Sequence, residues 1–235
     1  MSILQLNHLR QRLNRLPAWR VGEPRRVAVG IEAVDRLLPT DGLARGAVHE
    51  VLSESTPEGA VSFAMLLLRA ASAGGGMGVW CDPRRALYPP ALAAQHVDSG
   101  RLVLLRPRNR AEEVWAIVEC LRCKGVSAVV AMPPRLSNVE ARRLQLAAER
   151  GGSVGLLLRS ADVKSRPYAA ATRWRVEPAP GNESVRRWKV ELVHGHGGRV
   201  GESVLLEVCR ETNLMRAAES LVDRSTQTPP ARVTA

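Results

Sequence analysis

The sequence predicts an α/β domain whose mostly parallel sheet is flanked by helices and continues into an antiparallel extension near the C-terminus. Two observations predict this class. Between residues 47 and 158, short runs that are apolar throughout alternate with longer stretches of helical period, which is typical of parallel strands covered on both faces. After residue 159 the helical period disappears, and segments that alternate apolar and polar residues follow, as in antiparallel strands.

The first expected element is a helix over residues 2–16, which ends before a proline because proline cannot continue a helix. Leucines recur on it at alternating spacings of three and four residues, as Leu6, Leu9, Leu13 and Leu16. Such a stripe is apolar on one side of a helix, and a linker over residues 17–24 separates it from the core. The stripe predicts either a partner-binding surface or packing against the chain's own domain.

The remaining elements follow in order along the chain. The parallel strands are expected at residues 47–52, 78–81, 102–105, 128–132 and 154–158, and the helices at residues 57–73, 89–96, 111–124 and 138–150. The antiparallel strands are expected at residues 172–177, 187–193 and 203–208, with a glycine-rich turn at 194–201. The chain therefore divides into a helix and linker over residues 1–24, a core domain over 25–212, and a short helix with a disordered tail over 213–235.

Composition points to an anionic partner without identifying it. The chain has 235 residues and a net charge of +11, and all but three of its 34 basic residues are arginines. A positive field attracts nucleic acid, although a solvated basic surface has the same composition. The first DNA contacts to expect are paired arginines, namely Arg25, Arg26, Arg142, Arg143, Arg186 and Arg187. The scarcity of aromatic residues, 3% of the chain, argues against a platform for stacking bases.

No motif predicts a catalytic, metal-binding or cofactor-binding site. Cys120 and Cys123 form a Cys-x-x-Cys pair near the end of a helix, whereas a redox pair gains its reactivity at a helix start and a zinc site needs a second pair. His194 and His196 belong to the glycine-rich turn. The glycines at residues 74–78 follow a helix and precede a strand, the reverse of the dinucleotide-binding order.

The expected compartment is a reducing cytoplasm. The four cysteines do not form a disulfide framework in a chain of this length. We find no signal-peptide pattern and no apolar run of about 18 residues, so we expect no contact with a membrane.

Three phrases, in the right order, resemble the entry to a RecA-family core. The first runs from Gly30 to Leu38 and contains Asp35, and the second, from Gly42 to Val51, contains Gly46 and Glu50. The third is Trp80-Cys-Asp-Pro-Arg-Arg-Ala-Leu-Tyr-Pro89. The resemblance covers residues 29–208 and implies a RecA-like fold. It also implies two DNA-facing loops, at residues 133–137 and between Ser160 and Tyr168. Both are short in this chain, so RecA's own mode of filament binding is not expected, although Lys164 and Arg166 remain in the second loop as expected DNA contacts.

The departures from that family concern ATP. The segment from Ser53 to Ser62 stands where the family has its phosphate-binding loop, but it contains no lysine to reach the phosphates. Thr56 is the expected helix cap, and Glu58 in the first turn puts a carboxylate where a phosphate would bind. Arg84 stands in place of the family's catalytic glutamate, and the strand at residues 128–132 ends without an aspartate for Mg²⁺. The sequence therefore predicts a RecA-like domain that does not hydrolyse ATP.

A RecA-like core of this size without a phosphate-binding loop resembles the ImuA family. That resemblance implies an accessory role in DNA-damage-induced translesion synthesis, with an ImuB-type relative of Y-family polymerases as partner and an error-prone C-family polymerase as indirect partner. Direct DNA contact and self-association are left open. Two alternatives remain: a SulA-like inhibitor of cell division that acts by protein contact, and a degenerate ATPase with an unconventional loop.

Overall fold

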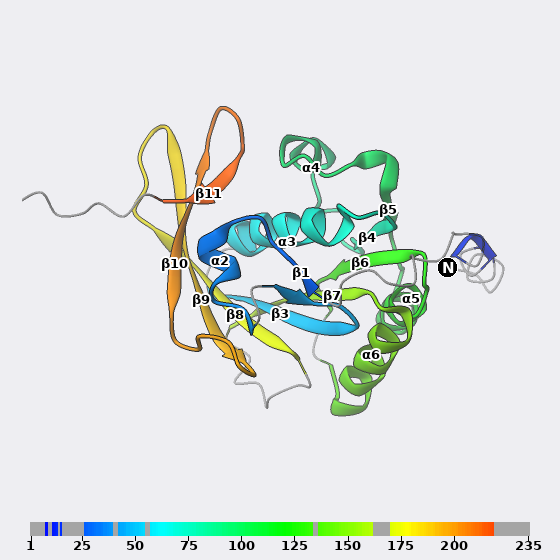
Figure 1. Ribbon diagram of the computed structural model, residues 1–235. Helices are drawn as coiled ribbons and strands as arrows, with labels where there is room; N and C mark the ends of the chain where they lie inside the picture. The colour runs from blue at the N-terminus through cyan, green and yellow to red at the C-terminus, as the bar shows by residue number, and fades with distance from the viewer. Residues whose placement is uncertain are drawn as a thin grey trace, which may run out of the picture.

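The predicted alternation of strands and helices is present in the computed structural model, which describes residues 8, 11–13, 15, 26–39, 42–54, 57–133, 136–161 and 170–218 (Figure 1). In chain order the described elements are β1 (Arg26–Val27), α2 (Glu32–Asp35), β2 (Leu43–Ala44), β3 (Ala47–Ser53), α3 (Pro57–Ser72), β4 (Met77–Cys81), α4 (Pro89–Ala94), the 3₁₀ turn η2 (Ser99–Arg101), β5 (Leu102–Leu105), α5 (Arg110–Leu121), β6 (Val126–Ala131), α6 (Asn138–Gly151), β7 (Val154–Ser160), β8 (Thr172–Ala179), β9 (Val185–Gly195), β10 (Ser203–Cys209) and β11 (Met215–Ala217).

Nine of these strands form one sheet in the order β11-β10-β9-β8-β3-β7-β6-β4-β5. All neighbours from β8 to β5 are parallel, and all neighbours from β8 to β11 are antiparallel. The predicted parallel core with an antiparallel extension is therefore confirmed. One detail differs, because β8 lies parallel to β3 and the antiparallel part begins one strand later than the sequence pattern predicted.

The sheet is covered by α3 on one face and by α5 and α6 on the other (Figure 1). Helix α3 is apolar on nearly all sides, since nine of its sixteen residues are buried. Its Phe63 meets Trp174 of β8 edge to face, with ring centroids 5.4 Å apart. Helix α6 begins at a reciprocal cap in which the Ser137 hydroxyl accepts from the Glu140 amide and the Glu140 carboxylate accepts from the Ser137 amide.

The C-terminal boundary requires a correction. We expected a short helix from residue 213, but Met215–Ala217 forms strand β11, paired antiparallel with β10. The turn before β11 also binds back to the core, because Gln95 at the end of α4 donates to the carbonyl oxygen of Asn213 at 2.6 Å. The sheet therefore extends past residue 212. Within the described ranges, no helix has the length and apolar character that a membrane span requires.

A buried ion-pair network ties together the three central strands. Glu50 of β3 is 1% exposed and accepts from two arginines, one on each neighbouring strand. Arg159 Nη1 of β7 lies 2.8 Å from Glu50 Oε1, and Arg173 of β8 reaches Oε2 at 2.7 Å. Both carboxylate oxygens are thus satisfied by charged donors, which offsets the cost of removing the charge from water.

A neutral histidine occupies the opposite face of β3. His49 Nε2 lies 2.9 Å from the carbonyl oxygen of Ala44, so this nitrogen carries the proton. His49 Nδ1 then accepts from the Thr172 hydroxyl at 2.7 Å, and Thr172 in turn accepts from Trp174 Nε1 at 3.0 Å. Burial lowers the pKa of His49 to about 4, although its hydrogen bond to Ala44 favours the charged ring.

Replacing Glu50 by glutamine should destabilise the fold strongly. The buried Arg159 and the half-buried Arg173 would lose this counter-charge, which costs about 3–5 kcal/mol of unfolding free energy. Glu207 of β10 supplies a matched control, because it also binds two arginines, but one of them, Arg216, has a side chain that is 71% exposed. The control substitution Glu207→Gln should cost about 1 kcal/mol or less. Urea unfolding followed by circular dichroism measures both, and equal losses would contradict the assigned role of Glu50.

His49 should make stability fall with acidification. Its pKa is near 6.5 when unfolded and about 4 when folded, so between these values only the unfolded chain binds the proton. The contribution of His49 to the free energy of unfolding is therefore fully present above pH 6.5. It declines as the pH falls towards 4, by about 3 kcal/mol in all. The difference between wild type and His49→Gln, followed by urea unfolding from pH 7 to 4, isolates this contribution. Parallel pH curves for the two proteins would contradict it.

Candidate functional site

The parallel strands place their carboxyl ends along one edge of the sheet, where open α/β sheets bind their ligands. At this edge β3 ends at Ser53 and α3 begins at Pro57. Residues 55 and 56, including the predicted cap Thr56, lie outside the described part of the chain. Glu54 and Glu58 are exposed on either side of that gap. Two carboxylates therefore stand at the positive end of the α3 dipole, where they favour the helix and repel a phosphate.

The phosphate-loop pattern can be placed on this junction residue by residue. In that pattern the lysine stands six residues after the first glycine and the Mg²⁺-binding hydroxyl follows directly. If the pattern begins at Ser53, where β3 ends, the lysine position is Gly59 and the hydroxyl position is Ala60. Both residues are buried in the first turn of α3. Neither can clamp a phosphate or bind a metal ion.

Trp188 of β9 fills the space beside Gly59. A Cβ atom at Gly59 would lie 2.5 Å from Trp188 Nε1, so only glycine permits this contact. The indole is 6% exposed, and the Arg186 guanidinium lies 5.7 Å from the centre of its ring. Sequence reasoning missed this tryptophan, although the alternation over residues 187–193 places Trp188 on the same face as the buried Val190 and Leu192.

The loop that follows β4 is held by a buried carboxylate. Asp82 is 6% exposed, and its two oxygens accept from the amides of Ala86 and Leu87 at 2.9 and 3.2 Å. Arg84 in this loop is exposed, and Arg85 adopts a positive φ of 54°. A left-handed non-glycine residue persists only where its surroundings enforce it. Asp82 therefore shapes the loop, and the arginines that follow it project from a fixed backbone.

Two further ionisable side chains at this edge, Glu113 and Cys81, are buried, and the pKa of each is raised. Burial raises the pKa of the Glu113 carboxyl, while the charges of Arg84 and Arg110 act in the opposite direction. Burial, together with the negative charges of Glu113 and Asp82, raises the pKa of the Cys81 thiol to about 12. Cys81 is therefore not a nucleophile at neutral pH.

A groove of about 360 Å³ opens beside the first turns of α3. Most of its wall is apolar, and the residues come from α3, from the end of β4 and the loop after it, from α4 and from the end of β6. They include Val61, Met65, Leu87, Ala91 and Met132, with Glu58, Arg84 and Tyr88 as polar members. Because β6 ends at Ala131 and is followed by Met132 and Pro133, the groove has no carboxylate at the end of that strand to hold a metal ion.

The other chemical candidates occupy structural positions. Cys120 is fully buried, and burial raises the pKa of its thiol. The Cys123 thiol donates to the carbonyl oxygen of Leu13 at 3.3 Å. His194 and His196 meet edge to face in the turn, with ring centroids 5.2 Å apart. Among the described residues, no group of three or more potential ligands is arranged to hold a metal ion.

Leu13 is placed against the chain's own domain. It is 5% exposed and belongs to the apolar core beneath α5 and α6. The other three leucines of the predicted stripe, Leu6, Leu9 and Leu16, lie outside the described residues. The burial of Leu13 therefore supports the interpretation in which the N-terminal segment packs on its own core.

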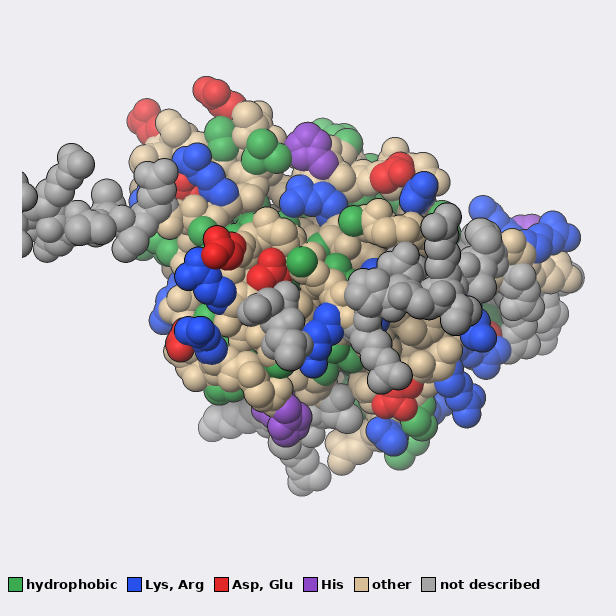
Figure 2. Space-filling model, viewed as in Figure 1, with side chains coloured by type: hydrophobic (Ala, Val, Ile, Leu, Met, Phe, Trp, Pro, Cys, Tyr) green, Lys and Arg blue, Asp and Glu red, His purple; other side chains and the backbone are tan. Residues whose placement is uncertain are grey.

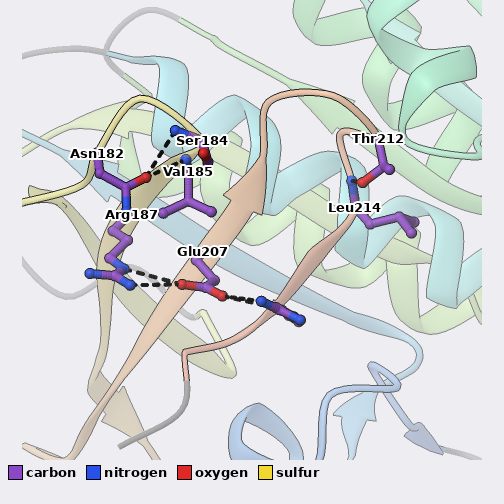
Figure 3. A network of polar contacts seen from close by, with 8 residues as sticks. Asn182, Ser184, Val185, Arg187, Glu207, Thr212 and Leu214 are labelled. Carbon is purple, nitrogen blue, oxygen red and sulfur yellow. Dashed lines mark hydrogen bonds and ion pairs between the residues drawn. The ribbon is translucent and has the colours of Figure 1, made fainter. Parts of the chain in front are cut away.

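The paired arginines do not form one surface. Arg26 donates to the carbonyl oxygens of Pro39 and Gly42, and Arg186 lies over Trp188. Arg187 is bound to Glu207, which also accepts from Arg216 on β11, as the close view of this network shows (Figure 3). The residues Arg25, Lys164 and Arg166 lie outside the described residues.

Arg142 and Arg143 remain as an exposed pair on α6. On the face shown in Figure 2, basic side chains are interspersed with acidic ones, and several basic ones lie at the lower right, over α5 and α6. This pair is therefore the part of the expected DNA-contact set that the structure leaves accessible among the described residues.

The comparisons with known proteins agree with this architecture. No protein-family profile matches the chain. Protein ImuA of Caulobacter vibrioides, from strains NA1000 / CB15N and ATCC 19089 / CB 15, is 31% identical over 205 residues, which cover 76% of this chain and 82% of that protein.

Two solved structures share the fold. The RadB recombinase has a TM-score of 0.63 at 14% identity and covers 82% of this chain and 99% of its own. A KaiC-like protein from Pyrococcus horikoshii OT3 has a TM-score of 0.60 at 15% identity and covers 86% of this chain and 100% of its own. These likenesses confirm the predicted RecA-like fold.

Gly59→Ala should reverse the usual effect of that substitution in a helix. Elsewhere in a helix, alanine in place of glycine adds about 1 kcal/mol of stability. Here the new methyl group overlaps the Trp188 indole, so we expect a loss of about 1–3 kcal/mol. In a Trp188→Ala background, the same change should become stabilising. Thermal and urea unfolding of the four proteins of this cycle measures the coupling, and additive effects would show that the indole does not press on Gly59.

Proposed function

Because the chain belongs to the ImuA family, we propose that it is a non-catalytic RecA-like adaptor in DNA-damage-induced translesion synthesis. Its proposed partner is an ImuB-type relative of Y-family polymerases, and an error-prone C-family polymerase joins through that partner. Direct contact with DNA is proposed through Arg142 and Arg143, the exposed pair on α6.

The contact between Trp188 and Gly59 carries the non-catalytic part of the proposal. Phosphoryl transfer needs a cation on the β and γ phosphates, a hydroxyl and a carboxylate on Mg²⁺, and a group that orients water. At the junction between β3 and α3, this chain has Gly59, which is covered by the Trp188 indole, followed by Ala60. Glu58 is exposed beside them. A lysine at residue 59 would also have to displace a buried tryptophan, so the loop cannot be restored by one substitution.

The adaptor part of the proposal rests on what the domain keeps. The described residues form a nine-stranded sheet with helices on both faces, so the chain can present fixed surfaces without a nucleotide to order them. The N-terminal segment contributes Leu13 to that core. Leu6, Leu9 and Leu16 are retained as proposed partner contacts.

The protein should show no nucleotide-dependent stabilisation. A nucleotide present at 100 times its dissociation constant would add about 2.7 kcal/mol. For a domain of this size that corresponds to roughly 5–10 °C in melting temperature. We expect a shift of less than about 1 °C with millimolar MgATP or MgADP, measured by differential scanning fluorimetry beside a RecA-family ATPase as positive control. A saturable shift with either nucleotide would contradict the proposal.

Co-purification tests the adaptor role itself. The tagged chain, expressed together with the ImuB-type protein of its own organism, should retain that protein without added nucleotide. Loss of this gene should lower the frequency of damage-induced mutation. If its overproduction instead gave filamentous cells with an unchanged mutation frequency, division inhibition would replace the adaptor role.

A further inference from the structure

Three exposed arginines lie on two adjacent segments at one end of the groove beside α3, and one of them, Arg84, lines it. The loop after β4 carries Arg84 and Arg85, and the segment after β5 carries Arg106, all three exposed. The two segments are adjacent because the Asp82 amide donates to the carbonyl oxygen of Leu105 at 2.7 Å. None of these three arginines forms an ion pair within 4 Å with another described residue, although the charge of Arg84 acts on the nearby Glu113 carboxyl, and Arg110 is bound to Glu140 at 2.7 Å.

The floor of the groove is suited to an apolar side chain. Val61, Met65, Leu87, Ala91 and Met132 line it, and its volume of about 360 Å³ lies in the range of roughly 300–1,000 Å³ typical of binding pockets. Tyr88 at the rim is 70% exposed, the large exposure that aromatic anchors of interfaces have before a partner covers them.

The backbone that presents this rim is already ordered. The Asp82 carboxylate binds the amides of Ala86 and Leu87, and Arg85 between them is held at a φ of 54°. A binding loop with a fixed backbone loses little conformational entropy when its partner arrives. The positive φ of Arg85 thus marks a loop whose shape is enforced at the site where its side chains are exposed.

We propose that this groove binds an acidic peptide segment of a partner protein, with a bulky apolar residue in the groove and flanking carboxylates on Arg84, Arg85 and Arg106. Arginine suits carboxylates because its planar fork can donate two hydrogen bonds to one of them. The inference deepens the proposed adaptor function and rests on it, since it names the chemistry by which a partner is held.

Two observations favour a peptide over single-stranded nucleic acid. Most of the groove wall is apolar, so the groove suits an apolar side chain better than a run of charged phosphates. Base stacking needs successive aromatic rings, and Tyr88 is the one exposed aromatic among the residues that line the groove.

Fluorescence anisotropy with full-length protein tests this proposal. The probe is a fluorescein-labelled ten-residue peptide with a central Leu-Phe pair between Asp and Glu residues. Control peptides replace the pair by Ser-Ser or the acids by their amides. We expect saturable binding of the first peptide only, and affinity that falls as salt is raised from 50 to 500 mM, since charge contacts at a rim are screened.

Paired variants locate the site. Arg84→Glu with Arg106→Glu should weaken peptide binding at least about tenfold. A matched charge change at the opposite edge of the sheet, Lys124→Glu with Arg150→Glu, should leave it within about twofold. Ala91→Phe fills the groove without altering charge and should also abolish binding. Melting curves check that each variant folds.

Other outcomes overturn the proposal. If a twelve-nucleotide oligo(dT) binds through Arg84 and Arg106 and the peptide does not, the surface recognises nucleic acid. If neither probe binds, or if the Lys124 and Arg150 control variant weakens peptide binding as much as the groove variant, this groove is not the docking site. The ImuB-type co-purification could succeed in each of these cases, so failure of the groove and failure of the adaptor role are distinguishable.

Discussion

The structure of the carboxyl edge of the sheet depends on the position of β8 beside β3, and a buried ion-pair network joins these two strands. Glu50 on the central strand is bound by Arg159 from one side and by Arg173 from the other. Buried ion pairs add little net stability over apolar packing, but breaking one leaves a charge without a partner, so they select one arrangement. Here the selected arrangement places β8 next to β3 in parallel register, with Glu50 opposite Arg173.

The pairing of β8 with β3 also determines the structure at the carboxyl edge of the sheet. Once β8 lies beside β3, the hairpin that follows places β9 next to it and turns Trp188 towards α3. The indole then packs on Gly59 in the first turn of that helix. The space that a phosphate and its lysine would need is thus part of the hydrophobic core. An apolar contact of this kind stabilises the fold continuously, whereas a nucleotide would do so only when bound.

The architecture could be predicted well from the sequence because the two patterns that predict it, apolar runs and helical periods, are local. Apolar runs and helical periods depend on residues a few positions apart, and they located the strands and helices from Ala47 to Cys209 within a few residues. The parallel pairing of β8 depends on the Glu50–Arg173 pair, whose members are 123 residues apart, and no local pattern reports it. Strand β11 was missed for a related reason, since its three residues are too few to show an alternation.

The candidate site was less predictable than the fold. Adjacent arginines drew attention in the sequence, but neighbours in a strand point to opposite faces. Arg186 lies over Trp188 on the inner face, while Arg187 binds Glu207 on the outer one. No spacing of residues in the sequence could predict the groove, because its wall combines α3, the loop after β4, α4 and the end of β6.

The carboxyl edge of the sheet remains the place where this fold offers fixed loops, whichever ligand it meets. Gly59 is covered by the indole, and the exposed Glu58 beside it disfavours an anion at this end of α3. The adjacent loop after β4 is still held by Asp82, and its exposed side chains are arginines over an apolar groove. A short protein segment can carry both the carboxylates that would bind these arginines and the apolar side chain that would enter the groove. The proposed adaptor role and the proposed peptide groove therefore rest on the same edge of the sheet.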